Sequence, residues 1–392
     1  MFRVCKNINH FSEVIYYIGL SAYIFASTLK ISMLGQAEII QNFITVSRFF
    51  GVITCFFSIF FRKNISLKFL LFIISITLTF ILVMLKIDDH GGLLMFLVMV
   101  GAWKCNSFII AKIHLFFAGI VFILGIIGSQ IGIVEDRIFY FYRSSTNVFE
   151  RHSLGMTYCT TFASLSFFLF GTYLFLKKKK LGIIEMLILI LLTFVIYYFS
   201  RSRLELLMTL FMIACYVKLS FFKKLFKYKT VNFLISNIFL LTLVITLLLS
   251  LIYKTDPFLF KRMNDIFTGR LDLVSQAIDT YGFSLFGESI PMQGGGSIDF
   301  DSTFGYFFID AFYMNWLLVY GCILMFLLIL FFHWIIKILV LNRKYKIVIL
   351  VSFACFHGII ISAIMQPQIN PFFLMALAEA SCCIPKRKNY EN

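Results

Sequence analysis

Long apolar runs separated by short polar segments make up most of this 392-residue chain. Unpaired backbone groups are costly in lipid, so a run that crosses a membrane is expected to be a helix. The pattern predicts an all-α polytopic integral membrane protein with about twelve transmembrane helices, each near the ~20 apolar residues that a crossing needs. These runs cover residues 14–29, 39–61, 66–85, 92–103, 113–133, 155–176, 182–199, 204–222, 231–253, 312–336, 347–363 and 371–385.

One long polar segment, residues 254–311, interrupts the apolar runs and contains eight acidic and four basic residues. Apolar residues recur within it at the three- and four-residue spacing of a helix face: Leu271, Val274, Ile278 and Tyr281. This spacing predicts a short amphipathic helix that lies on the membrane face or across the mouth of the bundle. The glycine run at 294–296 lacks the Lys and Ser/Thr of a P-loop, so it is interpreted as loop flexibility.

Composition supports the membrane class and sets several other classes aside. The chain is 60% hydrophobic and 14% charged, whereas globular domains average about 45–50% apolar and about 25% charged residues. Its formal charge of +16 comes from short basic clusters between apolar runs, as in topogenic loops, so no nucleic-acid partner is expected. The nine cysteines are scattered without metal-ligand or disulfide spacing, and we therefore expect no metal and no cofactor.

Charge also predicts the orientation of a single membrane domain, residues 1–392. With the amino terminus inside, 23 of the 35 Lys and Arg residues fall on the inner side, as the positive-inside rule expects. Both termini are then cytoplasmic, and the loops 134–154 and 254–311 are extracytoplasmic. Arg3 and Lys6 precede the first apolar run without a small-residue cleavage site, so this run is interpreted as an uncleaved first helix.

The basic residues on the outer side differ in kind, because most are arginines whereas the inner loops use mainly lysine. Arginine binds phosphate or carboxylate through two points, which lysine does not. Arg201 and Arg203 lie where two apolar runs meet, and charge there marks a functional site by default. The competing explanation is structural pairing, for example of Arg201 with Glu205.

Two residues are candidate acids or bases. Asp310 stands where the chain enters the run 312–336, and His152 lies beside the external Arg151. Each could serve as a general base, or Asp310 could pair with an arginine and His152 could be a solvated loop residue. The pair Asp299 and Asp301 resembles the metal-binding aspartates of soluble glycosyltransferases, but nucleotide sugars are cytoplasmic and this loop is predicted to be outside.

An ordered set of short motifs resembles the Wzy-type polymerases of O-antigen and capsular polysaccharide, which are related to the O-antigen ligases. The motifs are Arg151-His152-Ser153-Leu154-Gly155, Ser200-Arg201-Ser202-Arg203, Thr268-Gly269-Arg270 followed by Leu285-Phe286-Gly287, and the stretch from Asp310 to Gly321. They cover residues 151–321. The resemblance implies a GT-C-like membrane glycosyltransferase in the bacterial cytoplasmic (inner) membrane.

The resemblance also implies a substrate and a reaction. The family joins oligosaccharide repeat units carried on undecaprenyl diphosphate, on the outer side of the membrane, with a flippase and a chain-length regulator as partners. Arg151, Arg201, Arg203 and Arg270 would bind the departing diphosphate, and Asp310 or His152 would activate the attacking hydroxyl.

Two alternatives stay open from the sequence. An O-antigen ligase shares the fold and the chemistry, and the motifs separate it poorly from a polymerase. A flippase or transporter for lipid-linked sugars belongs to a different class, and such proteins usually show internal repeats and polar sites at the membrane midplane. The chain shows no convincing repeat, and its external charges gather near the outer surface instead.

Overall fold

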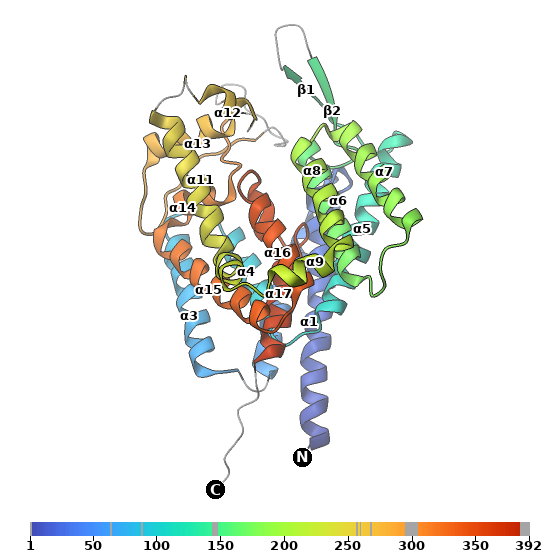
Figure 1. Ribbon diagram of the computed structural model, residues 1–392, viewed down its shortest axis with the longest axis vertical. Coiled ribbons are helices and arrows are strands. Elements are labelled where there is room, and N and C mark those ends of the chain that lie inside the picture. Colours follow the sequence, from blue (N-terminus) through green and yellow to red (C-terminus); the bar gives the residue numbers. More distant parts are fainter. Residues whose placement is uncertain are drawn as a thin grey trace.

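The computed structural model describes residues 2–62, 65–87, 89–142, 148–255, 258, 260–266, 269–294 and 305–384. Helices dominate these residues, with one antiparallel pair of strands (Figure 1). In chain order the elements are α1 (Phe2–Lys30), η1 (Met33–Gly35), α2 (Glu38–Phe57), η2 (Ser58–Phe61), α3 (Leu67–Met84), α4 (Gly91–Gly101), α5 (Ser107–Gln130), β1 (Ile138–Tyr142), β2 (Val148–His152), α6 (Cys159–Leu176), α7 (Ile183–Ser200), α8 (Arg203–Val217), α9 (Leu219–Leu225), α10 (Lys229–Ser236), α11 (Ile238–Thr255), α12 (Lys261–Ile266), α13 (Arg270–Tyr281), α14 (Phe312–Val319), α15 (Gly321–Leu341), α16 (Tyr345–His357), η3 (Ser362–Met365) and α17 (Phe372–Cys383).

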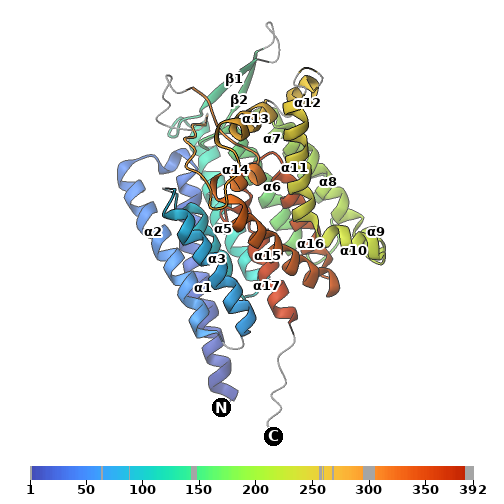
Figure 2. The same cartoon turned by 90° about the vertical axis from the view of Figure 1, so that its left-hand side faces the viewer.

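The prediction of a helical polytopic membrane protein is confirmed. Most long helices run along the long axis of a single bundle (Figures 1 and 2). The start of α1 and the end of α17 lie at one end of this bundle, and β1, β2, α12 and α13 lie at the other. We call the second end, which carries the β1–β2 hairpin, the hairpin end.

Long helices account for only part of the predicted spans. Seven helices of the described residues are long and apolar enough to cross a membrane, or eight if the bent pair α8 and α9 forms one span. The sequence led to about twelve because hydropathy registers apolar runs regardless of bends and of whether the helix reaches the ~20 residues of a crossing. The pair α8 and α9 bends by 83°, and α4, α16 and α17 contain 11, 13 and 12 residues.

The short helices α16 and α17 form a hairpin in the middle of the bundle (Figure 1). At a rise of 1.5 Å per residue each spans roughly 20 Å, less than the ~30 Å hydrocarbon core. Non-helical backbone at that depth must be buried in protein, and the connecting residues Ile364, Gln368 and Asn370 are buried. Asn370 Nδ2 donates to the Ile364 carbonyl at 2.7 Å, which closes this turn.

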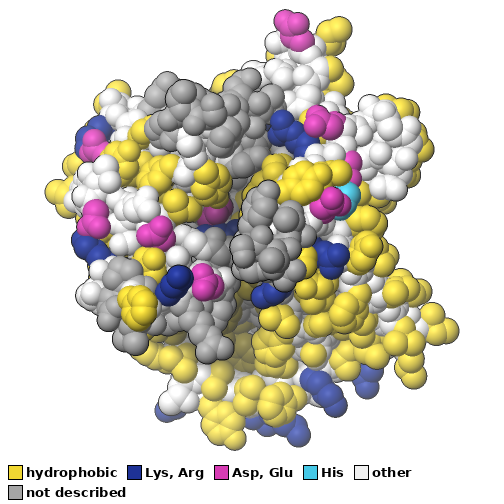
Figure 3. Space-filling view, turned by 90° about the horizontal axis from the view of Figure 1, so that it is seen from above, with side chains coloured by type: hydrophobic (Ala, Val, Ile, Leu, Met, Phe, Trp, Pro, Cys, Tyr) yellow, Lys and Arg dark blue, Asp and Glu magenta, His cyan; other side chains and the backbone are white. Residues whose placement is uncertain are grey.

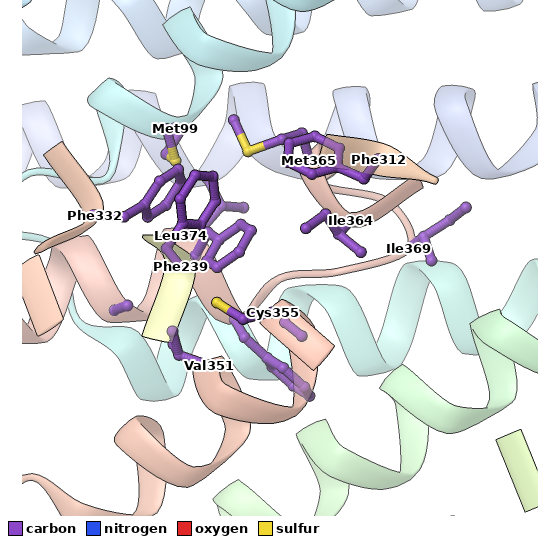
Figure 4. Close-up of a cluster of buried hydrophobic side chains, with 14 of the residues drawn as sticks. Met99, Phe239, Phe312, Phe332, Val351, Cys355, Ile364, Met365, Ile369 and Leu374 are labelled. Carbon is purple, nitrogen blue, oxygen red and sulfur yellow. The ribbon is translucent and has the colours of Figure 1, made fainter. Parts of the chain in front are cut away.

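Figure 4 shows part of the hydrophobic core, a cluster of buried side chains from α4, α11, α14, α15, α16, η3 and α17. The rings of Phe239 and Phe332 stack with their centroids 4.6 Å apart. Phe332 in turn meets Phe373 of α17 at 4.5 Å. Residues 372–378 of α17 are all apolar and all buried, as expected for a helix inside a bundle.

The motif Leu285-Phe286-Gly287 packs against the break between α14 and α15. Glu288 N donates to the Leu318 carbonyl at 3.1 Å and Cys322 N donates to the Ser284 carbonyl at 3.0 Å. Gly287 has a φ of 80° and Gly321 a φ of 88°. A Cβ on Gly287 would lie 1.9 Å from the Val319 carbonyl oxygen, and one on Gly321 would lie 2.4 Å from Gly287 N. Two motif glycines therefore have a packing role.

This contact predicts the effect of a single methyl group. Gly287→Ala should lower the apparent melting temperature of the purified protein in detergent, because it adds a clash with backbone to the strain of a positive φ, which is about 1–3 kcal/mol. Gly132→Ala is the matched control, since Gly132 has a φ of 75° with open space around it. Equal shifts for the two variants would contradict the packing argument.

Candidate functional site

A cavity of about 670 Å³ opens near the hairpin end, between the strands, the α7–α8 turn, the α12–α13 region and the tip of the α16–α17 hairpin. Ile360 and Ile361 contribute from that tip. Charged side chains gather on this end of the molecule, whereas hydrophobic ones dominate the periphery (Figure 3).

Positive charge dominates the lining of this cavity. Two carboxylates, Glu205 and Asp265, face five cationic side chains: Arg151, Arg201, Arg203, Lys261 and Arg270. All four arginines that the sequence singled out therefore line one cavity. Charges interact more strongly in such a partly desolvated space than in bulk water, so the cavity favours an anionic ligand.

Arg151 ties the strand β2 to the turn between α7 and α8. Its Nε donates to the Ser200 carbonyl at 2.6 Å, and its Nη2 donates to Ser202 Oγ at 2.9 Å. The guanidinium carbon lies 4.8 Å from the centre of the Phe141 ring, which adds a cation–π contact. Arg151 thus holds the turn that carries Arg201 and Arg203.

Arg201 occupies that turn with a φ of 52°, a left-handed conformation that is strained for a residue with a side chain. Its guanidinium lies 5.0 Å from the centre of the Tyr198 ring. Its Nε is buried and has no hydrogen-bond partner among the described residues. A buried donor without an acceptor costs about 1–3 kcal/mol, so this unmet donor adds to the strain of the turn.

Arg203 is the first residue of α8 and its side chain is exposed within the cavity. The first N–H groups of a helix point away from its body and favour an anion. α8 has 15 residues, so its positive end adds to the charge of Arg203. The α7–α8 turn thus presents two guanidinium groups and a helix N-terminus to the same space.

Arg270, the first residue of α13, forms an ion pair with Asp310. Its Nε lies 3.0 Å from Asp310 Oδ2, and Tyr306 Oη donates to the same oxygen at 3.4 Å. Burial acts to lower the pKa of Arg270, but the carboxylates of Asp310 and Glu205 outweigh it and raise that pKa. Arg270 lines the cavity and Asp310 is outside its lining. The sequence allowed two roles for Asp310, a general base or the partner of an arginine. In the structure Asp310 is paired with Arg270.

His152 is also placed away from the cavity lining. Its Nδ1 lies 2.7 Å from Asp136 Oδ2, and the other Asp136 oxygen accepts from Leu154 N at 2.8 Å. The His152 ring meets Phe199 edge-on at 5.9 Å. These contacts secure the base of the strand pair, and they separate His152 from the four arginines.

The sequence missed a buried pair beneath the cavity. Glu205 is 5% exposed, and in the described structure its carboxylate contacts Ser164 and His357, whereas the sequence suggested Arg201 as its partner. Ser164 Oγ donates to Glu205 Oε1 at 3.1 Å, and His357 Nε2 lies 3.7 Å from the same oxygen. His357 comes from the C-terminal end of α16, and no local pattern could have connected it to Glu205.

An apolar groove of about 1160 Å³ runs along α5, α6 and α7. Gly182 and Glu185, at the start of α7, line one end, and Leu154 and Phe199 line the other. Phe199 directly precedes Ser200, which accepts the hydrogen bond from Arg151. The groove therefore ends one residue from the turn that lines the arginine cavity.

No family model, curated protein or solved structure matches the chain. Among the described residues, no group of three or more His, Cys, Asp or Glu side chains is arranged to hold a metal ion. Arg143, Asp299, Asp301 and residues 295 and 296 of the glycine run lie outside the described residues. The arginine cavity and the apolar groove are therefore the two features of the described residues that bear on function.

The ion pair of Arg270 and Asp310 predicts a measurable coupling. Arg270→Gln or Asp310→Asn alone leaves a partly buried charge without its partner, so the double variant should lose less stability than the sum of the two. A coupling of about 0.5–3 kcal/mol is expected from contacting residues, measured by thermal unfolding in detergent. The exposed pair Lys254 and Asp279 is the control, with about 0–1 kcal/mol. Additive effects at Arg270 and Asp310 would refute the coupling.

Proposed function

We propose that this protein polymerises lipid-linked oligosaccharide repeat units into an O-antigen or capsular polysaccharide. In this proposal the growing glycan leaves its undecaprenyl diphosphate and is transferred to a hydroxyl of the next lipid-linked unit. The observation that carries the proposal is the convergence of four arginines on one cavity. The resemblance to the Wzy-type polymerases supplies the reaction.

The chemistry of the cavity supports a diphosphate ligand. Planar guanidinium groups bind phosphate oxygens through two parallel hydrogen bonds, and the buried Nε of Arg201 has no acceptor among the described residues. A diphosphate that departs from a sugar gains negative charge, so fixed cations lower the barrier without a divalent metal. The volume of about 670 Å³ lies within the ~300–1,000 Å³ range of small-molecule sites.

The apolar groove supports a lipid carrier. A polyprenyl chain needs an apolar surface, and the groove along α5, α6 and α7 provides one that ends beside the α7–α8 turn. A molecule with a long apolar chain and an anionic head could then occupy both spaces together. This pairing favours a lipid diphosphate over a free nucleotide sugar.

The proposal includes the finer features of the fold and its orientation. We place the hairpin end outside the bacterial cytoplasmic membrane, with both termini and the lysine-rich loops in the cytoplasm. In this GT-C-like bundle the long apolar helices cross the membrane completely. The shorter apolar helices, which correspond to the remaining predicted spans, enter it only partly. Partners in this scheme are a flippase and a chain-length regulator.

The position of the cavity favours an enzyme over a flippase. Transporter sites lie near the membrane midplane on broken helices, whereas the arginines line a cavity near the hairpin end. A ligase would use the same cavity with a different acceptor. Deletion of the gene distinguishes a polymerase from a ligase. Cells without the polymerase still carry single repeat units on the final acceptor, whereas cells without the ligase carry none.

Substitution of the arginines tests the proposal. In null cells, Arg201→Gln and Arg203→Gln should each reduce polymer by about 10²–10³-fold, as loss of one donor to a developing oxyanion does. The readout is the ladder of polymer lengths on a gel, at matched amounts of membrane-inserted protein. Arg137→Gln is the control, since Arg137 lies near Glu135 outside the cavity lining. Unchanged ladders for both variants would refute the diphosphate role.

A further inference from the structure

Glu205 is a buried carboxylate at the inner face of a cavity dominated by cations. It lies three residues after the N-cap Ser202 of α8, so the helix N-terminus stabilises its negative charge. It is 5% exposed and still contributes to the cavity lining. Buried charges are retained where they are paired or functional.

The carboxylate of Glu205 has two side-chain partners among the described residues. Ser164 donates to Oε1 at 3.1 Å and the His357 ring lies 3.7 Å from that oxygen. Both known partners approach one oxygen of the carboxylate. Among the described residues, no other side chain hydrogen-bonds to either carboxylate oxygen of Glu205.

The His357 ring is held by aromatic packing. Its ring stacks on Phe167 at 5.3 Å with an angle of 6° between the planes, and it meets Phe168 edge-on at 5.1 Å. Both ring nitrogens are buried and lack a hydrogen-bond partner among the described residues. Aromatic packing thus aims Nε2 at Glu205 and leaves a small gap that a shift of either side chain closes.

The other acidic or basic candidates are less suited to the same task. Asp310 is engaged by Arg270 and Tyr306 outside the cavity lining, and His152 is engaged by Asp136. Asp265 lines the cavity from α12 but is exposed, so water competes for it. Glu205 alone among these side chains is both desolvated and in the lining.

We infer that Glu205 is the general base of the glycan transfer and that His357 positions it. This inference rests on the proposed function. The acceptor hydroxyl oxygen forms a bond to the anomeric carbon while the bond from that carbon to the diphosphate oxygen breaks. The bonding electron pair leaves with the diphosphate, which the arginines stabilise, and the hydroxyl proton passes to Glu205. Release of this proton to solvent with the products restores the carboxylate.

The test separates binding from turnover in the full-length protein. Glu205→Gln keeps the shape and an acceptor for Ser164 but cannot take a proton. We expect polymer formation from the accumulated lipid-linked repeat units of null-cell membranes to fall by about 10²–10⁴-fold, the usual contribution of general-base catalysis. Binding of sugar-free undecaprenyl diphosphate should persist or tighten, because a negative charge has left a cationic cavity.

Each outcome of this experiment has a clear meaning. Turnover by Glu205→Gln close to that of wild type overturns the inference, and so does a loss of undecaprenyl diphosphate binding together with turnover, which would make Glu205 structural. If wild type forms no polymer and does not bind undecaprenyl diphosphate, the proposed function itself fails. Glu288→Gln is the matched control, since it makes the same change at an exposed carboxylate that pairs with Lys86 outside the cavity lining, and its turnover should stay near that of wild type.

The positioning role of His357 has its own test. His357→Gln retains a donor toward Glu205 and should recover most of the turnover that His357→Phe loses, since Phe fits beside Phe167 and Phe168 but offers no donor. The loss should appear in kcat with little change in KM for the lipid-linked repeat unit. Equal turnover of the two variants, or a change confined to KM, would overturn the positioning role.

Discussion

The structure depends on one constraint: a charged side chain inside an apolar bundle must be paired or must face a polar cavity. The hairpin end satisfies it for each guanidinium in a different way. Arg151 uses a backbone carbonyl and a hydroxyl, and Arg270 uses a carboxylate. Arg201 uses the face of an aromatic ring and keeps one donor unmet. The strands, the strained turn and the short central helices all serve to hold these groups around one space.

Hydropathy was sufficient for the fold class, because apolar runs in lipid have no alternative to helices. It carries no information on bends in an apolar run. The bend after α8 lies in a run whose mean hydropathy is high enough to predict a span. The same is true of the short helices α16 and α17. The helix α13 could be anticipated, since Leu271, Val274 and Ile278 share the face that is buried in the structure.

From the sequence, the candidate site could be predicted only from basic residues on the side of the membrane where the positive-inside rule does not expect them. The positive-inside rule does not explain the arginines on the predicted outer side. The structure brings four of them, Arg151, Arg201, Arg203 and Arg270, to one cavity. Their partners were beyond reach, because His357 approaches Glu205 through tertiary packing alone. The strand pair was missed as well. Its register sets Phe139 opposite Arg151, and β1 shows no alternation because its five residues, Ile138–Tyr142, are all apolar or aromatic.

The α7–α8 turn connects the two halves of the proposed site, and its geometry explains why it is strained. Phe199 must face the apolar groove, whereas Arg201 and Arg203 must face the cavity. In a continuous helix, Phe199 and Arg201 would point to different faces, but the chain would not turn back on itself. The second half of such a helix would then lead away from the first, so α7 and α8 could not lie side by side along the groove and the cavity. The left-handed φ of Arg201 reverses the chain within two residues, and Arg151 locks that reversal through Ser200 and Ser202. Strain here is the physical consequence of placing a lipid-facing ring next to an anion-binding turn.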